Sequence, residues 1–189
     1  MQVNRAAPGV EIKRATLEDV EAIALVLHES FAEFESLYTP AAFAATTPTS
    51  DQIRQRWSEG PVWVALQHGI MVGTVSAVPK PTGLYVRSMA VCPPARGQGV
   101  AGGLLKEVES VAIHDRHKRL FLSTTLFLTE AIHLYERFGF QRSDEGPQDL
   151  FGTPLFTMIK PLEPTNGAPA SQSTLTQNKE TKLNEQSFS

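Results

Sequence analysis

Residues 89–105 read MAVCPPARGQGVAGGLL, and this segment decides the fold. An apolar run ends at Pro93 and Pro94, and a glycine-rich run then leads into the apolar pattern of a helix. The first N–H groups of a helix have no partner within the helix and form the positive end of its dipole, while glycines let a ligand approach the backbone closely. The segment therefore predicts a strand, a loop and a helix N-terminus that bind a pyrophosphate group.

Two common phosphate-binding loops do not fit these glycines. A Walker A loop needs Gly-Lys followed by Ser or Thr, and the first lysine after the glycines is Lys106. The dinucleotide-binding pattern Gly-x-Gly-x-x-Gly is present at 97–102, but the prolines separate it from its strand. That pattern also needs an acidic residue near the end of the next strand, and the expected strand 120–125 ends in Ser-Thr-Thr. Both alternatives are therefore rejected.

A third kind of loop fits. Residues 96–101, RGQGVA, match the pattern of Arg or Gln, two residues, Gly, one residue, and Gly or Ala. Residues 131–140, AIHLYERFGF, form a second block with a helical pattern and an aromatic-rich exit into a strand. In this order, with a strand between them, the two blocks resemble the GCN5-related N-acetyltransferase (GNAT) family. The resemblance covers residues 10–162.

The resemblance implies acetyl-CoA as co-substrate and no metal. It implies that the loop backbone holds the pyrophosphate, with Arg96 adding charge. It also implies that residues 88–91 diverge from the neighbouring strand, so that their main chain binds the pantetheine arm and the acyl oxygen. The candidate cofactor-binding residues are Met89, Ala90, Val91, Arg96, Gly97, Gln98, Gly99, Val100, Ala101 and Gly102.

Tyr135 is the candidate catalytic residue, because the resemblance places the general acid of the family there. A phenol with a pKa of about 10 can protonate a thiolate of similar basicity. The same side chain lies on the apolar stripe of the expected helix 130–138, where an aromatic residue is more often part of the core. Spacing alone favours the core, whereas the resemblance favours catalysis.

The sequence departs from the family pattern at one position and offers no general base at another. Many relatives have an Asn where this chain has Leu128, so an amide contact with the cofactor arm is in question. Thr124, Thr125 and Thr129 are candidates to replace it, and they also suit a strand end and a helix start. The stretch 84–88 has no Glu to act as a general base. Proton removal through water, or an amine that arrives neutral, would fit this absence.

Pattern and resemblance together predict an α/β (α+β) fold. We expect a single GNAT-like domain with a central mixed, mostly antiparallel, twisted sheet of about six to seven strands flanked by about four helices. Strands are expected at 10–15, 62–66, 70–78, 83–92, 120–125, 140–143 and 155–160, and helices at 20–35, 51–58, 97–115 and 130–138. The chain divides into an N-terminal extension (1–9), the N-acetyltransferase domain (10–162) and a C-terminal tail (163–189). We expect the tail to be disordered because it is mostly polar.

Composition excludes several other classes of protein. A net charge of −3 over 189 residues does not indicate a protein that binds nucleic acid. The one cysteine cannot form a disulfide within the chain, and the five histidines lack the spacing of a metal site. Without an apolar run of about 18 residues or a signal-like start, we expect a cytoplasmic protein that does not associate with membranes.

The function predicted from these observations is that of an N-acetyltransferase. It transfers an acetyl group from acetyl-CoA to a primary amine of a small molecule or peptide by direct attack in a ternary complex. Residues 31–49 and 144–154 are expected to select the acceptor, and the resemblance is compatible with a homodimer. The alternative is a non-catalytic acyl-CoA-binding sensor or interaction module. Tyr135 favours the enzyme, while Leu128 leaves room for the alternative.

Overall fold

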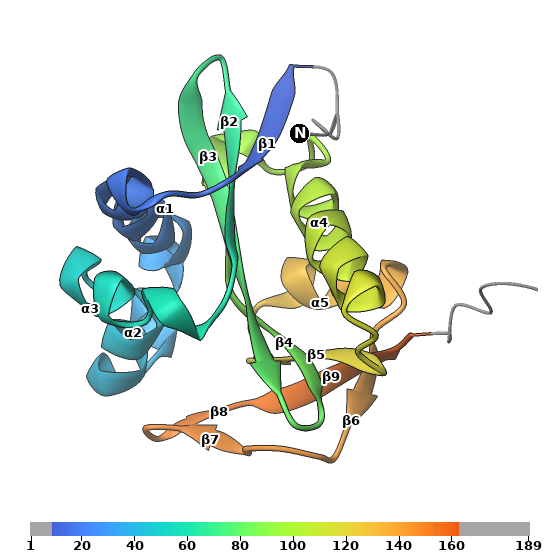
Figure 1. The fold of residues 1–189 in the computed structure, drawn as a ribbon. Helices are drawn as coiled ribbons and strands as arrows, with labels where there is room; N and C mark the ends of the chain where they lie inside the picture. Colours follow the sequence, from blue (N-terminus) through green and yellow to red (C-terminus); the bar gives the residue numbers. More distant parts are fainter. Residues whose placement is uncertain (1–8, 163–189) are drawn as a thin grey trace, which may run out of the picture.

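The computed structural model describes residues 9–162 (Figure 1). The strands are β1 (Val10–Arg14), β2 (Val62–Gln67), β3 (Ile70–Lys80), β4 (Gly83–Val91), β5 (Arg119–Thr124), β6 (Gln141–Ser143), β7 (Asp149–Leu150), β8 (Thr153–Pro154) and β9 (Phe156–Pro161). The α-helices are α1 (Val20–Phe31), α2 (Pro40–Thr46), α3 (Ser50–Gln55), α4 (Val100–His114) and α5 (Thr129–Arg137). The expected N-terminal extension, apart from Gly9, and the expected C-terminal tail lie outside the described residues.

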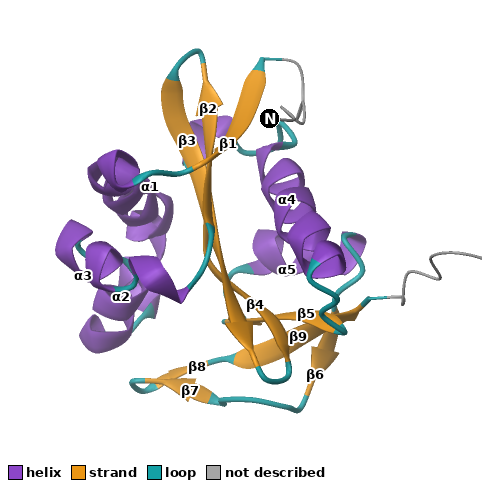
Figure 2. Cartoon of the chain, viewed as in Figure 1, coloured by secondary structure: helices purple, strands orange, loops and turns teal. Residues whose placement is uncertain are grey.

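Seven strands form one sheet in the order β1-β2-β3-β4-β5-β9-β6, and β7 and β8 form a separate hairpin. Every neighbouring pair in the large sheet is antiparallel except β4 and β5, which are parallel. Helices α1–α3 lie on one side of the sheet, and α4 and α5 lie on the other (Figures 1 and 2). The predicted fold is therefore confirmed, with five α-helices where about four were expected.

Helix α4 buries one face against the sheet. The buried residues recur at steps of three and four and are Val100, Leu104, Leu105, Val108 and Ala112. Each is at most 1% exposed, and they share one core cluster with side chains of β3, β4 and β5. This packing fixes the N-terminus of α4 next to the end of β4.

Helix α1 covers the opposite face of the sheet. Its residues Ile23, Val26 and Leu27 form a second buried cluster with Val64 of β2 and Ala90 of β4. The helix predicted over 20–35 is an α-helix only to Phe31 and continues as the 3-10 helix η2 (Ala32–Leu37). The sheet is thus covered on both faces where β4 ends.

The segment between the helices expected at 20–35 and 51–58 contains helix α2, which was not among the predicted helices. Thr39 is its N-cap, because its Oγ1 accepts a hydrogen bond from the N–H of Ala42 at 3.2 Å, and Pro40 occupies the first turn. The hairpin of β7 and β8 was not predicted. The N–H of Thr39 donates to Thr153 Oγ1 at 2.9 Å, and Thr39 Oγ1 donates to the carbonyl of Phe151 at 2.7 Å. These bonds hold the hairpin against the start of α2.

Candidate active site

The loop between β4 and α4 depends on glycine at two positions. After β4 the chain passes through the short 3-10 helix η4 (Pro93–Ala95). Gly97 and Gly99 then have φ values of 74° and 78°, in the left-handed region that favours glycine. Gly99 is the N-cap of α4, so the helix begins at Val100 rather than near Gly97 as expected. Residues 97–99 are the turn that directs the chain into the helix.

The N-terminus of α4 is open within residues 9–162, because none of their side chains caps it and its first turn contains no acidic residue. A Cβ added to Gly97 or Gly102 would meet no heavy atom of the described part of the chain within 4 Å, its chain neighbours and the helix's own backbone aside. Gly102 lies inside the helix, where glycine costs stability relative to alanine, and neither backbone strain nor crowding requires it there. The space beside these glycines therefore suits a ligand that approaches the free N–H groups closely.

Other residues of the loop can offer a ligand mainly their main chain. Gln98 accepts a hydrogen bond from Gln67 Nε2 at 2.7 Å and donates one to the carbonyl of Pro94 at 2.9 Å. Val100 is 1% exposed and belongs to the core, and Ala101 lies in the first turn of α4. Their contribution to anion binding is thus limited to backbone N–H groups.

Arg96 links the loop to α1 and η2, which lie on the opposite face of the sheet from α4. Its Nη2 donates to the carbonyl of Ser30 at 2.9 Å, and its Nε donates to the carbonyl of Val91 at 3.2 Å. The guanidinium also forms an ion pair with Glu33 of η2. Arg96 is therefore engaged by α1, η2 and β4 in this structure, which the sequence did not indicate.

Strands β4 and β5 diverge beside the loop. Their parallel pairing is confined to Leu84 with Leu120 and Tyr85 with Phe121. Further along β4, Ser88 has a φ of 52°, and the register with β3 shifts. Such a bulge turns the strand and leaves main-chain groups unpaired. Because the pairing with β5 ends at Tyr85, the β5-facing main chain of 86–91 has no strand partner among residues 9–162.

The bulge also determines which way the following side chains of β4 face. Val86 belongs to the core cluster under α4, whereas Ala90 belongs to the cluster under α1. In a regular strand these two side chains would lie on the same face. Met89 and Val91 pack at the edge of the α4 cluster. The expected donor-binding residues 89–91 thus lie in the diverging part of β4.

Tyr135 lies in α5 and is 7% exposed. Its ring centroid is 5.8 Å from that of Phe140, so the side chain is part of the core. Burial, with smaller contributions from Tyr85 and Tyr38, raises the pKa of Tyr135 far above the usual value of about 10. The phenol therefore remains protonated at physiological pH, and the raised pKa makes it a weaker acid than an exposed phenol.

Tyr38 is a neighbour of the site that the sequence did not identify. It is 9% exposed, and its ring packs edge-on against Phe127 with centroids 4.8 Å apart. Burial raises the pKa of Tyr38, and the nearby hydroxyls of Thr125 and Thr46 partly offset the rise. The sequence alone could suggest that an aromatic residue such as Tyr38 is buried, but it could not show which side chains surround it.

Leu128 places an apolar side chain at the position where the family pattern has an Asn amide. Leu128 is the N-cap of α5 and makes no side-chain capping bond. Among the candidate replacements, Thr129 is exposed and Thr124 is buried in β5. Thr125 is 3% exposed, and its Oγ1 has no hydrogen-bond partner of good geometry in the described chain. Of these three candidates, Thr125 is therefore the one whose hydroxyl is buried without a hydrogen-bond partner of good geometry in residues 9–162.

Metal ligands do not cluster within residues 9–162. No three His, Cys, Asp or Glu side chains come close enough there to hold an ion. Over the same residues, no helix has the length and apolar character needed to cross a membrane.

Comparison with known proteins identifies this arrangement. The family model of the acetyltransferase (GNAT) family matches residues 29–140. The chain belongs to the GNAT family. The uncharacterized N-acetyltransferase YjgM of Escherichia coli is 33% identical over 150 residues, which cover 75% of this chain and 89% of that protein. A probable N-acetyltransferase family 8 member 5 of Mus musculus is 35% identical over 92 residues, which cover 46% of this chain and 40% of that protein.

Solved structures have the same fold as this GNAT protein. The PaiA N-acetyltransferase of Thermoplasma acidophilum, in complex with coenzyme A, has a TM-score of 0.67 at 16% identity and covers 81% of this chain and 99% of its own. YncA of Salmonella typhimurium, a putative acetyltransferase with acetyl-CoA, has a TM-score of 0.63 at 21% identity, with coverages of 86% and 99%. As a member of the GNAT family, the chain is an acyltransferase whose acyl donor is acetyl-CoA.

Proposed function

We propose that this GNAT protein acetylates a primary amine of a small molecule or peptide by direct attack in a ternary complex, and that residues 10–162 form the catalytic domain. The observation that carries the proposal is the divergence of β4 and β5 between the open N-terminus of α4 and Tyr135. Tyr85, close enough to contribute to the raised pKa of Tyr135, is the last residue of β4 paired with β5.

The donor is held mainly by backbone. Free N–H groups from Gly97 to Gly102 bind the pyrophosphate, because the positive helix end favours an anion and the glycines leave room for it. Main-chain groups of Met89, Ala90 and Val91 bind the pantetheine arm and polarise the thioester carbonyl. In this proposal Arg96 acts on the pyrophosphate through its charge while remaining tied to Glu33.

Acetyl transfer then needs one bond to form and one to break. The neutral amine attacks the acetyl carbon, and the carbon–sulfur bond of the thioester breaks. Tyr135 donates its phenolic proton to the departing thiolate and regains a proton from solvent. The amine nitrogen loses its proton to water, since β4 carries no carboxylate to accept it.

Titration and turnover together test the proposal. Calorimetric titration should show binding of acetyl-CoA and none of NADH, and thiol release should be detected with at least one member of a panel of amines. Binding without thiol release from any amine would favour the alternative, a non-catalytic acyl-CoA sensor. The observation that supports this alternative is the apolar Leu128 at the usual amide position.

A further inference from the structure

A small pocket lies between helices α1 and α3 and the sheet, next to the bulge in β4. Its volume is about 30 Å³, room for about two water molecules or one carboxylate group. Its polar lining comes from Arg56, Thr74, Ser76, Arg87 and Ser88. Ser88 lines this pocket and directly precedes residues 89–91, to whose main chain we assign the thioester.

The charge of the pocket is positive. Arg56 and Arg87 are the charged residues that line it, and its lining contains no carboxylate. Arg87 forms an ion pair with Glu59, whose side chain is 38% exposed. Arg56 forms no ion pair with any carboxylate in residues 9–162. Two guanidinium groups with one carboxylate partner leave one uncompensated positive charge.

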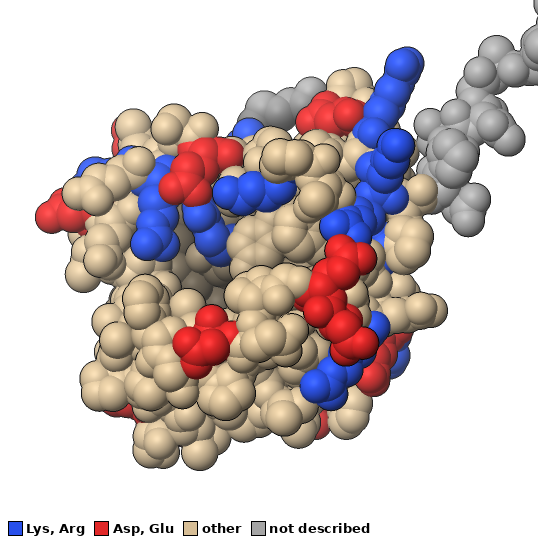
Figure 3. Space-filling view, turned by 90° about the horizontal axis from the view of Figure 1, so that it is seen from below, with Lys and Arg blue, Asp and Glu red and all other residues tan. Residues whose placement is uncertain are grey.

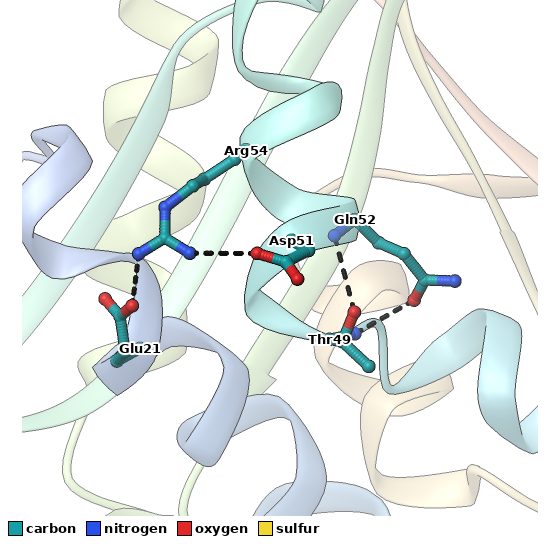
Figure 4. A network of polar contacts seen from close by, with 5 residues as sticks. All are labelled: Glu21, Thr49, Asp51, Gln52 and Arg54. Carbon is teal, nitrogen blue, oxygen red and sulfur yellow. Dashed lines mark hydrogen bonds and ion pairs between the residues drawn. The ribbon is translucent and has the colours of Figure 1, made fainter.

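The neighbouring arginine, Arg54, differs from Arg56 because it has two carboxylate partners. Figure 4 shows its guanidinium bridging Glu21 of α1 and Asp51 of α3. The same view shows the capping box of Thr49 and Gln52 that begins α3. Arg54 is thus fully occupied on the exposed side, whereas Arg56, directly after α3, lines the pocket without a carboxylate partner. Seen from below, the molecule is hollowed on the side of α1–α3, with Lys and Arg side chains along one edge of the hollow (Figure 3).

We propose that the acceptor is an amino acid or a similar amine that carries a carboxylate, and that Arg56, supported by Arg87, binds this carboxylate. The proposal rests on the proposed acetyltransferase function. A planar guanidinium matches a carboxylate with paired hydrogen bonds. Apolar neighbours such as Leu27, Ile53 and Trp57 line the same pocket and strengthen the attraction by excluding water.

The same geometry selects against simple amines. An amine without a carboxylate leaves the Arg56 guanidinium partly desolvated and unpaired, which costs binding free energy. An ammonium group placed there would also be repelled by the uncompensated charge. The serine hydroxyls add directional partners for an anion, although Ser76 Oγ already donates to the carbonyl of Arg87 at 3.2 Å. The pocket is therefore suited to an acidic group rather than to a second amine.

The test compares matched acceptors. Thiol release from acetyl-CoA is measured with L-amino acids, with the corresponding amino acid amides and with the decarboxylated amines. We expect kcat/KM to be at least about tenfold higher for the acids than for their amides, the range expected when a charged hydrogen-bonded pair is lost. The amide has the lower ammonium pKa and more free amine, so this preference would oppose intrinsic reactivity.

Variants assign the effect to the pocket. Arg56→Gln should raise KM for the preferred acid at least about tenfold with little change in kcat. Arg56→Lys keeps the charge but loses the paired geometry, so its KM should lie between those of the wild type and of Arg56→Gln. Arg54→Gln removes the same charge from the same region and should leave KM unchanged. Circular dichroism spectra of all variants should match that of the wild type.

The outcomes separate this proposal from the function on which it rests. If amides or decarboxylated amines are acetylated as well as the acids, the carboxylate proposal is wrong and the acetyltransferase function stands. An unchanged KM for the acid in Arg56→Gln would likewise remove Arg56 from the acceptor site. If no amine of any class is acetylated although acetyl-CoA binds, the proposed function fails and the acceptor proposal fails with it.

Discussion

Gly102→Ala should make the protein more stable and its binding of acetyl-CoA weaker. Gly102 is the third residue of α4, and a Cβ there would meet no heavy atom within 4 Å. Alanine favours a helix over glycine by about 0.5–1 kcal/mol. For a domain of this size, a gain of that order raises Tm by about 1–4 °C. The gain should appear in thermal unfolding measured without ligand.

The same substitution should weaken the binding of acetyl-CoA. The added methyl group occupies the space through which a phosphate would reach the first N–H groups of α4. Loss of one hydrogen bond to a charged group costs about 1.5–3 kcal/mol, so Kd for acetyl-CoA should rise by at least about tenfold. Calorimetric titration of wild type and variant measures this change directly.

Ser110→Ala is the matched control. Ser110 lies on the exposed side of the same helix, about 12 Å along its axis from Gly102. Alanine should again stabilise the helix slightly, and Kd for acetyl-CoA should not change. If Gly102→Ala binds acetyl-CoA like the wild type, Gly102 does not face the donor. A loss of stability in the same variant would show that the space beside it is needed by the fold.

Three other substitutions or titrations probe the site and core. Tyr135→Phe should lower kcat by about 10²–10⁴ in the thiol-release assay with little change in Kd for acetyl-CoA, and an unchanged kcat would leave Tyr135 as a core residue only. The folded-state pKa of Tyr135 is raised above the unfolded value of about 10, so its contribution to stability is complete below that pH and is lost above it. Urea unfolding should accordingly show the stability advantage of wild type over Tyr135→Phe shrinking above pH 10, and a constant difference would contradict the raised pKa. Leu104→Ala, at a fully buried position of α4, should cost about 2–5 kcal/mol in denaturant unfolding, and a smaller loss would mean that the core closes around the space left.

Local patterns in the sequence were sufficient to predict most of the sheet. The strand expected at 10–15 is β1, and the strands expected at 62–66 and 70–78 meet at a turn where His68 and Gly69 have positive φ values. The glycines at 97 and 99 likewise have the backbone conformation that only glycine adopts readily. In each case the signal lies within a few residues of the feature it determines.

Features that depend on distant contacts could not be predicted. The hairpin of β7 and β8 has strands of two residues each, too short for a periodic pattern, and it is held through Thr39, 114 positions before Thr153. The engagement of Arg96 by Ser30 and Glu33 also joins segments more than 60 residues apart. The pocket beside Ser88 is assembled from α1, α3, β2, β3 and β4, and no local pattern reveals such a meeting.

Within residues 9–162, the large sheet consists of two antiparallel halves, and the short pairing of β4 with β5 joins them in the sheet at two residue pairs. A donor whose arm bonds to the free edge of β4 would extend that seam and bridge the halves. In that case acetyl-CoA stabilises the folded protein as well as supplying the acetyl group. Its binding free energy adds to the free energy of unfolding, and the release of free coenzyme A after each turnover takes that support away again.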